Sequence, residues 1–314
     1  MSLFNTSAEP AKRVSQGQLE ALLSIYYQDS LTGMVRLTPA SEDKGEFFVL
    51  LYLDGDLFRM YQHLPKGYVR HDTQQWMSVL PQTELNLQSF QFPSRFLRPL
   101  QIIFETTKTG EVKTVSTPSV INMIHKLEGN PNPILAHFHW PSADGFAFVP
   151  GNNLASRNLS FWSPHHTSGI PSFARWPESE CRLTLFETEK ENTAWYENCL
   201  TLGLDYLYEQ IFKRYDELVG ASMVTRLEDQ LNSVARTQRW KISFTNRVLD
   251  DSHFFPSLSD MRIAYRTLLM SGQRHISSVV GEKLFEESAR AGFVSLSSVL
   301  QKTLTQDNIF TYRV

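Results

Sequence analysis

The stretch that decides the fold is residues 15–62, which read SQGQLEALLSIYYQDSLTGMVRLTPASEDKGEFFVLLYLDGDLFRMYQ. Its first part predicts an amphipathic helix. Ser15 and Gln18 have the spacing of a capping box, in which each side chain satisfies a backbone N–H group at the start of a helix. Apolar side chains then recur along one helix face, at Leu19, Leu22, Leu23 and Tyr26. We expect this helix to end near Asp29.

The rest of this stretch predicts three strands. Gly33 supplies a turn position before a strand at residues 34–38. The nearly continuous apolar run at residues 46–53 predicts a strand that is covered on both faces. Asp54-Gly55 is a strong hairpin signal, because both central residues of that turn adopt positive φ. Residues 57–62 then form the returning strand, and α+β is the predicted fold class.

The following segments are less regular. Residues 74–80 and 84–90 suit either a helix or a strand. Residues 101–106 and 111–117 flank Lys108-Thr109-Gly110, which predicts another hairpin. The other elements expected before residue 190 are a short helix after Thr117-Pro118 and strands at residues 134–140, 145–149, 159–162 and 181–187.

After residue 191 the apolar positions recur at helical spacing, which predicts a mainly helical domain. The predicted organisation is a loose arm at residues 1–14, an α+β domain with an irregular β extension at residues 15–190, and the helical domain at residues 191–314. Within the helical domain we expect a break at Gly220, an extended segment at residues 240–249, helices at residues 257–270 and 273–290, and a final short helix.

Two short motifs in the helical half are alike. Val219-Gly220 and Val280-Gly281 are each followed, three positions on, by an apolar residue. One interpretation is an internal duplication, in which each glycine allows a close helix crossing. The other is a chance similarity between amphipathic helices.

The composition favours a folded protein in a reducing compartment. Of the 314 residues, 41% are hydrophobic and 20% are charged, which is typical of globular proteins and enough for about two domains. Only two cysteines occur, Cys181 and Cys199, so a disulfide framework is not expected. No apolar run is long enough for a signal peptide or a membrane span. We therefore expect a cytoplasmic protein.

Signatures of the common enzyme classes are absent from the sequence. There is no G-x-S-x-G elbow, no phosphate-binding glycine loop, and no kinase or EF-hand pattern. Cys199 falls at helical spacing with Trp195 and Leu202, which indicates a buried hydrophobic residue rather than a nucleophile. The sequence therefore favours a non-catalytic protein without a cofactor.

The most suggestive chemical pattern is His137-Phe138-His139. Residues i and i+2 of a strand share a face, so the two imidazoles could bind one metal ion. A cupin-like metal site would also need a carboxylate a few residues later. Asp144 stands in that region, no glutamate does, and His165-His166 follows further along. The alternative is that His137 and His139 are ordinary half-exposed strand residues.

A second pattern combines basic residues with Trp240. The basic residues are Lys213, Arg214, Arg236, Arg239 and Lys241. Such an arrangement can stack on and neutralise nucleic acid. However, 30 basic residues face 33 acidic ones, and a net charge of −3 lacks the excess expected of a phosphate-backbone binder. A solvated helix end with a docked Trp240 is therefore favoured.

The opening stretch also resembles a known family. A helix with Leu19, Leu22 and Leu23 leads through Leu31-Thr32-Gly33 to a strand, and a second strand ends in Tyr52-Leu53-Asp54-Gly55-Asp56-Leu57. Over residues 15–62 this order is similar to the PATAN-type domain of bacterial signalling and surface-motility proteins. The resemblance implies an adaptor that binds other proteins and itself, without catalytic residues. The contact surface that it implies lies around Tyr26, Tyr27, Phe58 and Tyr61.

The leading prediction is a signalling or scaffold protein that acts through protein–protein interaction. Self-association is expected too, because long amphipathic helices and abundant aromatic residues often bury a symmetric interface. The alternatives are a metal-dependent enzyme built around His137 and His139, and a nucleic-acid-binding regulator.

Overall fold

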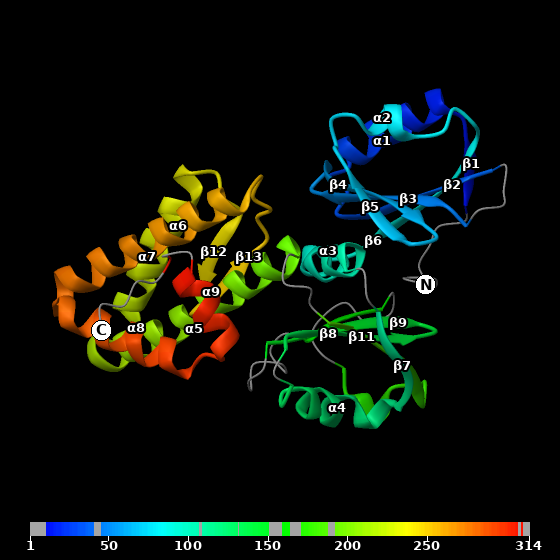
Figure 1. The fold of residues 1–314 in the computed structure, drawn as a ribbon. Helices are drawn as coiled ribbons and strands as arrows, with labels where there is room; N and C mark the ends of the chain where they lie inside the picture. The colour runs from blue at the N-terminus through cyan, green and yellow to red at the C-terminus, as the bar shows by residue number, and fades with distance from the viewer. Residues whose placement is uncertain are drawn as a thin grey trace. The chain divides into compact units, whose positions relative to one another are not determined.

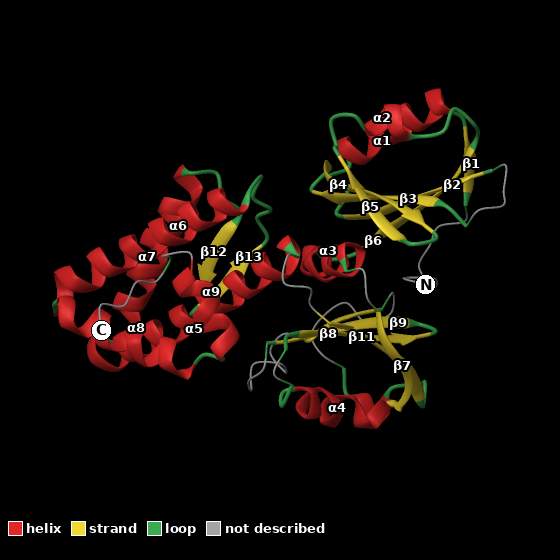
Figure 2. Cartoon of the chain, in the orientation of Figure 1, coloured by secondary structure: helices red, strands yellow, loops and turns green. Residues whose placement is uncertain are grey.

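The structure is a computed structural model. It describes residues 11–40, 45–106, 109–130, 132–150, 159–163, 171–187, 192–306 and 309. The chain divides near residue 194 into two compact units. The first unit holds two antiparallel sheets with their helices, and the second is mainly helical (Figures 1 and 2). The predicted α+β fold class with a helical C-terminal half is confirmed.

The first sheet of the first unit has six antiparallel strands. They are β1 (Lys12–Val14), β2 (Gly33–Pro39), β3 (Phe47–Leu53), β4 (Asp56–Leu64), β5 (Gly67–His71) and β6 (Leu85–Gln91). Their order in space is β1-β6-β2-β3-β4-β5, so β6 lies between β1 and β2. Helices α1 (Gln16–Gln28) and α2 (Trp76–Val79) cover one face of this sheet (Figure 1).

The local signals of the opening stretch are confirmed. The backbone N–H of Ser15 donates to Gln18 Oε1 at 2.9 Å, which completes the predicted capping box of α1. Asp54 and Gly55 have φ values of 50° and 89°, as the hairpin between β3 and β4 requires. The turn also rests on the end of α1, because a Cβ atom added to Gly55 would lie 2.5 Å from the carbonyl oxygen of Tyr27.

The predicted hairpin around Lys108-Thr109-Gly110 is wrong. Its first arm belongs to helix α3 (Leu97–Glu105), which follows the 3-10 turn η1 (Ser94–Phe96). The β-branched pair at residues 102–103 suits a strand, but the buried side chains of Leu97, Leu100 and Phe104 follow helical spacing. Phe104 packs on the first sheet: its ring centroid lies 5.1 Å from that of Tyr61 and 4.7 Å from that of Tyr68.

The second sheet has five antiparallel strands. They are β7 (Thr109–Ser116), β8 (Ile134–Trp140), β9 (Ala143–Val149), β10 (Leu159–Trp162) and β11 (Glu180–Glu187). Their order is β10-β9-β8-β11-β7, so β8 is central. Helix α4 (Val120–Leu127), which follows the turn η2 (Thr117–Ser119), packs on one face, and a third short turn is η4 (Phe173–Arg175). On that face, buried Trp140 donates from Nε1 to Thr117 Oγ1 at 2.9 Å.

Among its described residues, the second unit consists of helices and one small hairpin. The helices are α5 (Thr193–Val219), α6 (Ala221–Thr237), α7 (Leu258–Val280), α8 (Glu282–Ser295) and α9 (Ser298–Gln306). The hairpin is β12 (Ile242–Thr245) with β13 (Val248–Asp251). Asn232 holds the hairpin on α6, because its side-chain amide donates to and accepts from the backbone of Phe244 at 2.8 and 2.7 Å.

Glycines set the helix boundaries in this unit, though not all as expected. Gly220 breaks the chain between α5 and α6 as predicted, with φ 83°, and Gly281 does the same between α7 and α8 with φ 91°. A Cβ atom at either position would meet no described atom within 4 Å, so the close-crossing interpretation is wrong. The break expected after residue 270 is also wrong. There α7 continues through Gly272, which packs against Tyr208.

Candidate binding groove and histidine–aspartate centre

An open groove of about 650 Å³ lies among α1, the β3–β4 turn and α2. We call it the N-terminal groove. Its lining residues are Glu20, Leu23, Ser24, Tyr27, Gln28, Tyr52, Gly55, Asp56, Leu57, Trp76 and Met77. Leu23 and Tyr52 are buried, whereas the side chain of Tyr27 is 64% exposed. The volume is within the range of about 300–1,000 Å³ that is common for binding pockets.

The charge of the N-terminal groove is acidic. Glu20 and Asp56 are both exposed, and no lysine or arginine is among the lining residues. Within the described part of the chain, neither carboxylate has a cation at ion-pair distance. The groove therefore combines apolar and aromatic surface with two carboxylates that are available to a positively charged group.

The contact residues implied by the family resemblance are placed differently from one another. Tyr27 lines the N-terminal groove. Tyr26 is half-buried, and its ring meets that of Tyr52 edge-on, with the two ring centroids 6.3 Å apart. Phe58 is half-buried, and the guanidinium of Arg59 lies 5.7 Å from its ring centroid.

The expectation for Tyr61 is corrected. Its side chain is completely buried, it packs on Phe104, and its hydroxyl donates to Glu105 Oε1 at 2.8 Å. Neighbouring residues of a strand project from opposite faces of the sheet, and Met60 belongs to the core that α1 covers. Tyr61 thus lies on the α3 side of the sheet, away from the groove on the α1 side.

Sequence reasoning missed the wall of the groove that Trp76 and Met77 provide. Both side chains are half-buried on α2, a helix of one turn that a local pattern barely defines. The sequence feature that could have indicated this part of the groove is the pair of large apolar residues, Trp76 and Met77, after the polar run Asp72-Thr73-Gln74-Gln75.

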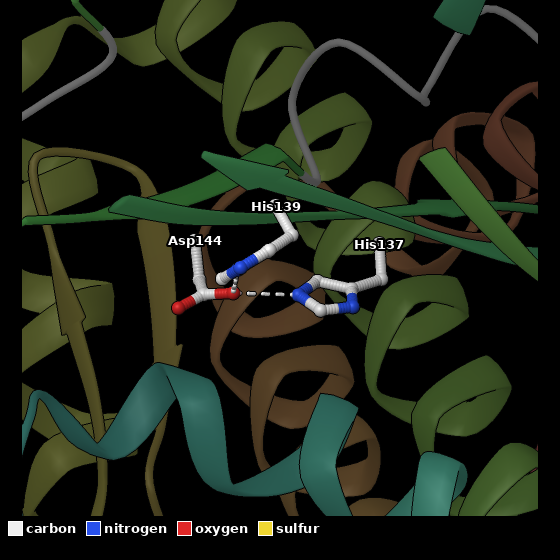
Figure 3. A network of polar contacts seen from close by, with 3 residues as sticks. All are labelled: His137, His139 and Asp144. Atoms are coloured by element: carbon white, nitrogen blue, oxygen red, sulfur yellow. Dashed lines mark hydrogen bonds and ion pairs between the residues drawn. The ribbon is translucent and has the colours of Figure 1, made fainter. Parts of the chain in front are cut away.

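The second candidate site is the cluster of His137, His139 and Asp144, which we call the histidine–aspartate centre. Asp144 Oδ1 accepts a hydrogen bond from His137 Nε2 at 2.7 Å and another from His139 Nδ1 at 3.0 Å. Figure 3 shows both rings turned toward the same carboxylate oxygen. His137 and Asp144 are 3% and 1% exposed, so the predicted half-exposed state is wrong for His137.

Strand pairing explains how the three side chains meet. In the β8–β9 register His139 lies directly opposite Asp144, and His137 lies opposite Phe146. Residues two apart on a strand share a face, so all four side chains project from the same side of the second sheet. The ring of His137 stacks on that of Phe146, with centroids 4.7 Å apart and planes 10° apart, which fixes its orientation.

The electrostatics of the centre keep its carboxylate ionised. Burial acts to raise the pKa of Asp144, but the hydrogen bonds from His137 and His139 and the charge of these histidines outweigh it. The pKa of Asp144 therefore lies below its ordinary value. A buried carboxylate with two imidazoles on one oxygen can hold a divalent metal ion or can serve as a polar network within the core. His165 and His166 lie outside the described residues.

The other sequence candidates are neither lining residues of the N-terminal groove nor members of the histidine–aspartate centre. Burial raises the pKa of the Cys181 and Cys199 thiols to about 12, which fits the prediction that Cys199 is not a nucleophile. In the basic cluster, Arg214 pairs with Glu217 at 2.8 Å and Trp240 packs on Phe255. Neither contact adds support to the nucleic-acid hypothesis, which the balanced charge of the sequence already disfavours.

Comparison with known proteins gives no relative. The sequence matches no protein-family model, and no curated protein or solved structure is significantly similar to it. Across the part of the chain that the structure describes, no helix combines the length and the apolar character needed to cross a membrane.

Proposed function

We propose that this protein is a non-catalytic signalling or scaffold adaptor that binds a partner protein in the N-terminal groove. The observation that carries the proposal is the groove itself. It joins an exposed aromatic residue, Tyr27, to a buried apolar floor and two carboxylates that have no described cation partner. The similarity of residues 15–62 to PATAN-type domains supports the same class of function.

The chemistry of the groove defines the kind of partner. An apolar or aromatic side chain can cover Leu23 and Tyr52, while a flanking lysine or arginine meets Glu20 or Asp56. Aromatic anchors supply most of the affinity in such contacts, whereas exposed charges mainly set specificity and association rate. The partner is therefore a protein segment with a hydrophobic anchor next to basic residues.

A peptide selection on the full chain tests this proposal. We expect a library of random short peptides to yield sequences with an aromatic or aliphatic anchor beside Lys or Arg. Fluorescence polarisation on an enriched peptide should then show about 10-fold weaker binding to the Glu20→Lys/Asp56→Lys variant, because two attractive charges become repulsive.

The matched control is Glu180→Lys, which reverses an exposed charge on β11 in the second sheet. This variant should bind the peptide as the wild type does. Enrichment of peptides without the expected pattern would argue against the proposal, as would equal affinity in the groove variant and the wild type.

Self-association is the second part of the proposed function. Helix α7 exposes two large apolar side chains seven residues apart, Ile263 at 58% and Met270 at 46%. Residues at this spacing lie on one face of a helix. An apolar face of this kind supports pairing with a second copy of the chain.

A further inference from the structure

We propose that the histidine–aspartate centre binds one divalent transition-metal ion, such as Zn²⁺ or Fe²⁺, through His137, His139 and Asp144. This inference does not depend on the N-terminal groove. Two nitrogen ligands and one carboxylate oxygen form a donor set suited to these ions. The harder ions Mg²⁺ and Ca²⁺ prefer oxygen ligands alone.

The distances between the ligand atoms are close to those that an ion requires. Atoms bonded to one ion at about 2.0–2.2 Å, with angles of about 90–110°, lie about 2.8–3.6 Å apart. The two nitrogen–oxygen distances are 2.7 and 3.0 Å, and the three ligand atoms all lie within 4.8 Å of one another. The two nitrogen–oxygen distances therefore suit a shared ion, and the ligands come from two directly paired strands.

The scaffold around these atoms is rigid. The ligands come from β8 and β9, and β8 pairs with strands on both sides. His137 and Asp144 are buried, and the stacking on Phe146 fixes the ring of His137. A site on regular strands holds its ligands more precisely than one on loops. Little conformational entropy of these side chains is therefore lost when an ion binds.

The site has an open side at His139. The side chain of His139 is 20% exposed, whereas those of the other two ligands are 4% and 1% exposed. An ion can enter from this side. Three protein ligands also leave at least one coordination position for water or another small ligand, as in zinc sites that are not closed by a fourth side chain.

Protonation and charge are compatible with this role. Each imidazole must turn a lone pair toward the ion and carry its proton on the other ring nitrogen, so His137 binds through Nε2 and His139 through Nδ1. With neutral imidazoles the centre has one negative charge in a buried position. A divalent cation bound by the three ligands places positive charge next to the buried carboxylate, which is electrostatically favourable.

Titration of the chelator-treated full chain with Zn²⁺ tests the proposal. Calorimetry should show one ion per chain. Co²⁺ in place of Zn²⁺ should give visible absorption bands that report nitrogen and oxygen ligation. The His139→Ala and Asp144→Asn variants should each bind Zn²⁺ about 100-fold more weakly or worse, because removal of a group that only supports a ligand already costs about 10–100-fold.

Asp144→Asn keeps the shape of the side chain, and near-UV circular dichroism confirms that each variant is folded. The control is His125→Ala, which removes an exposed histidine from α4 and should leave Zn²⁺ binding unchanged. The proposal is overturned if the folded wild type binds no Zn²⁺, if Asp144→Asn binds it as tightly as the wild type, or if Mg²⁺ binds equally well.

Discussion

At the scale of single residues, the two thiols show how burial sets reactivity. Cys181 lies on β11 and belongs to the core that α4 covers. Cys199 lies on the buried side of α5. Both side chains are less than 5% exposed. Burial in apolar surroundings disfavours the charged thiolate, which is why both pKa values rise to about 12.

We predict that neither thiol reacts with Ellman's reagent in the native protein at pH 8. A pKa of about 12 makes the thiolate on the order of 10³-fold scarcer than for an exposed cysteine with a pKa of about 8.5. Both cysteines should react in guanidinium chloride. Rapid reaction of either thiol in the folded chain would contradict this assignment.

The same pKa values predict a loss of stability at alkaline pH. Because the folded-state pKa lies above the unfolded-state pKa, the stabilising effect is complete below about pH 8.5 and is lost progressively up to about pH 12. The free energy of unfolding, measured with urea at several pH values, should decline over this range. The Cys181→Ala/Cys199→Ala variant should show a weaker decline.

At the scale of elements, the β3–β4 turn is fixed by its contact with the end of α1. Gly55 has positive φ, its N–H donates to Leu31 O at 2.8 Å, and a Cβ atom there would approach Tyr27 O at 2.5 Å. The turn residues Gly55 and Asp56 also line the N-terminal groove. The geometry of the groove thus depends on a position that only glycine fits.

We therefore predict that Gly55→Ala destabilises the protein and weakens peptide binding in the groove. The left-handed backbone alone costs about 1–2 kcal/mol for a non-glycine residue, and the collision with Tyr27 adds to this. Gly45→Ala is the matched control, since Gly45 has φ 62° but open space at its Cβ position. Urea unfolding should show a clearly larger loss for Gly55→Ala, and equal losses would contradict the prediction.

Elements with strong local signals could be predicted from the sequence, and those that depend on distant contacts could not. The capping box of α1 and the Asp54-Gly55 turn are encoded within a few residues. Helix α3 contains the β-branched pair Ile102-Ile103, whose local preference favours a strand, and contacts with the first sheet override that preference. The place of β6 between β1 and β2 depends on pairing across most of the sheet.

The candidate sites follow the same division. The shared face of His137 and His139 follows from the two-residue period of a strand. The role of Asp144 depends on the tight β8–β9 connection, which places it opposite His139. The N-terminal groove joins residues of α1 to Trp76 and Met77, which no short-range pattern relates.

At the scale of the whole molecule, we predict that the chain forms dimers through the apolar face of α7. Sedimentation velocity over a range of concentrations should show a reversible dimer. The Ile263→Glu/Met270→Glu variant should sediment as a monomer, because paired carboxylates would have to be buried in the interface.

Val248→Glu is the control for this experiment. Val248 is 59% exposed on β13, so the substitution adds a charge at a site of similar exposure outside α7. It should leave the dimer intact. A wild-type chain that remains monomeric at high concentration, or a double variant that dimerises normally, would contradict the prediction.

The strand order of the first sheet has a consequence for synthesis on the ribosome. Lys12–Val14 of β1 pair with Leu85–Leu87 of β6, and β6 also pairs with β2 on its other side. During translation, α1 and the β2–β3–β4 meander can assemble while the nascent chain still lacks β6. Within this sheet β1 is therefore made before its partner β6, and until β6 emerges β2 presents an open edge to which chaperones or other nascent chains can add.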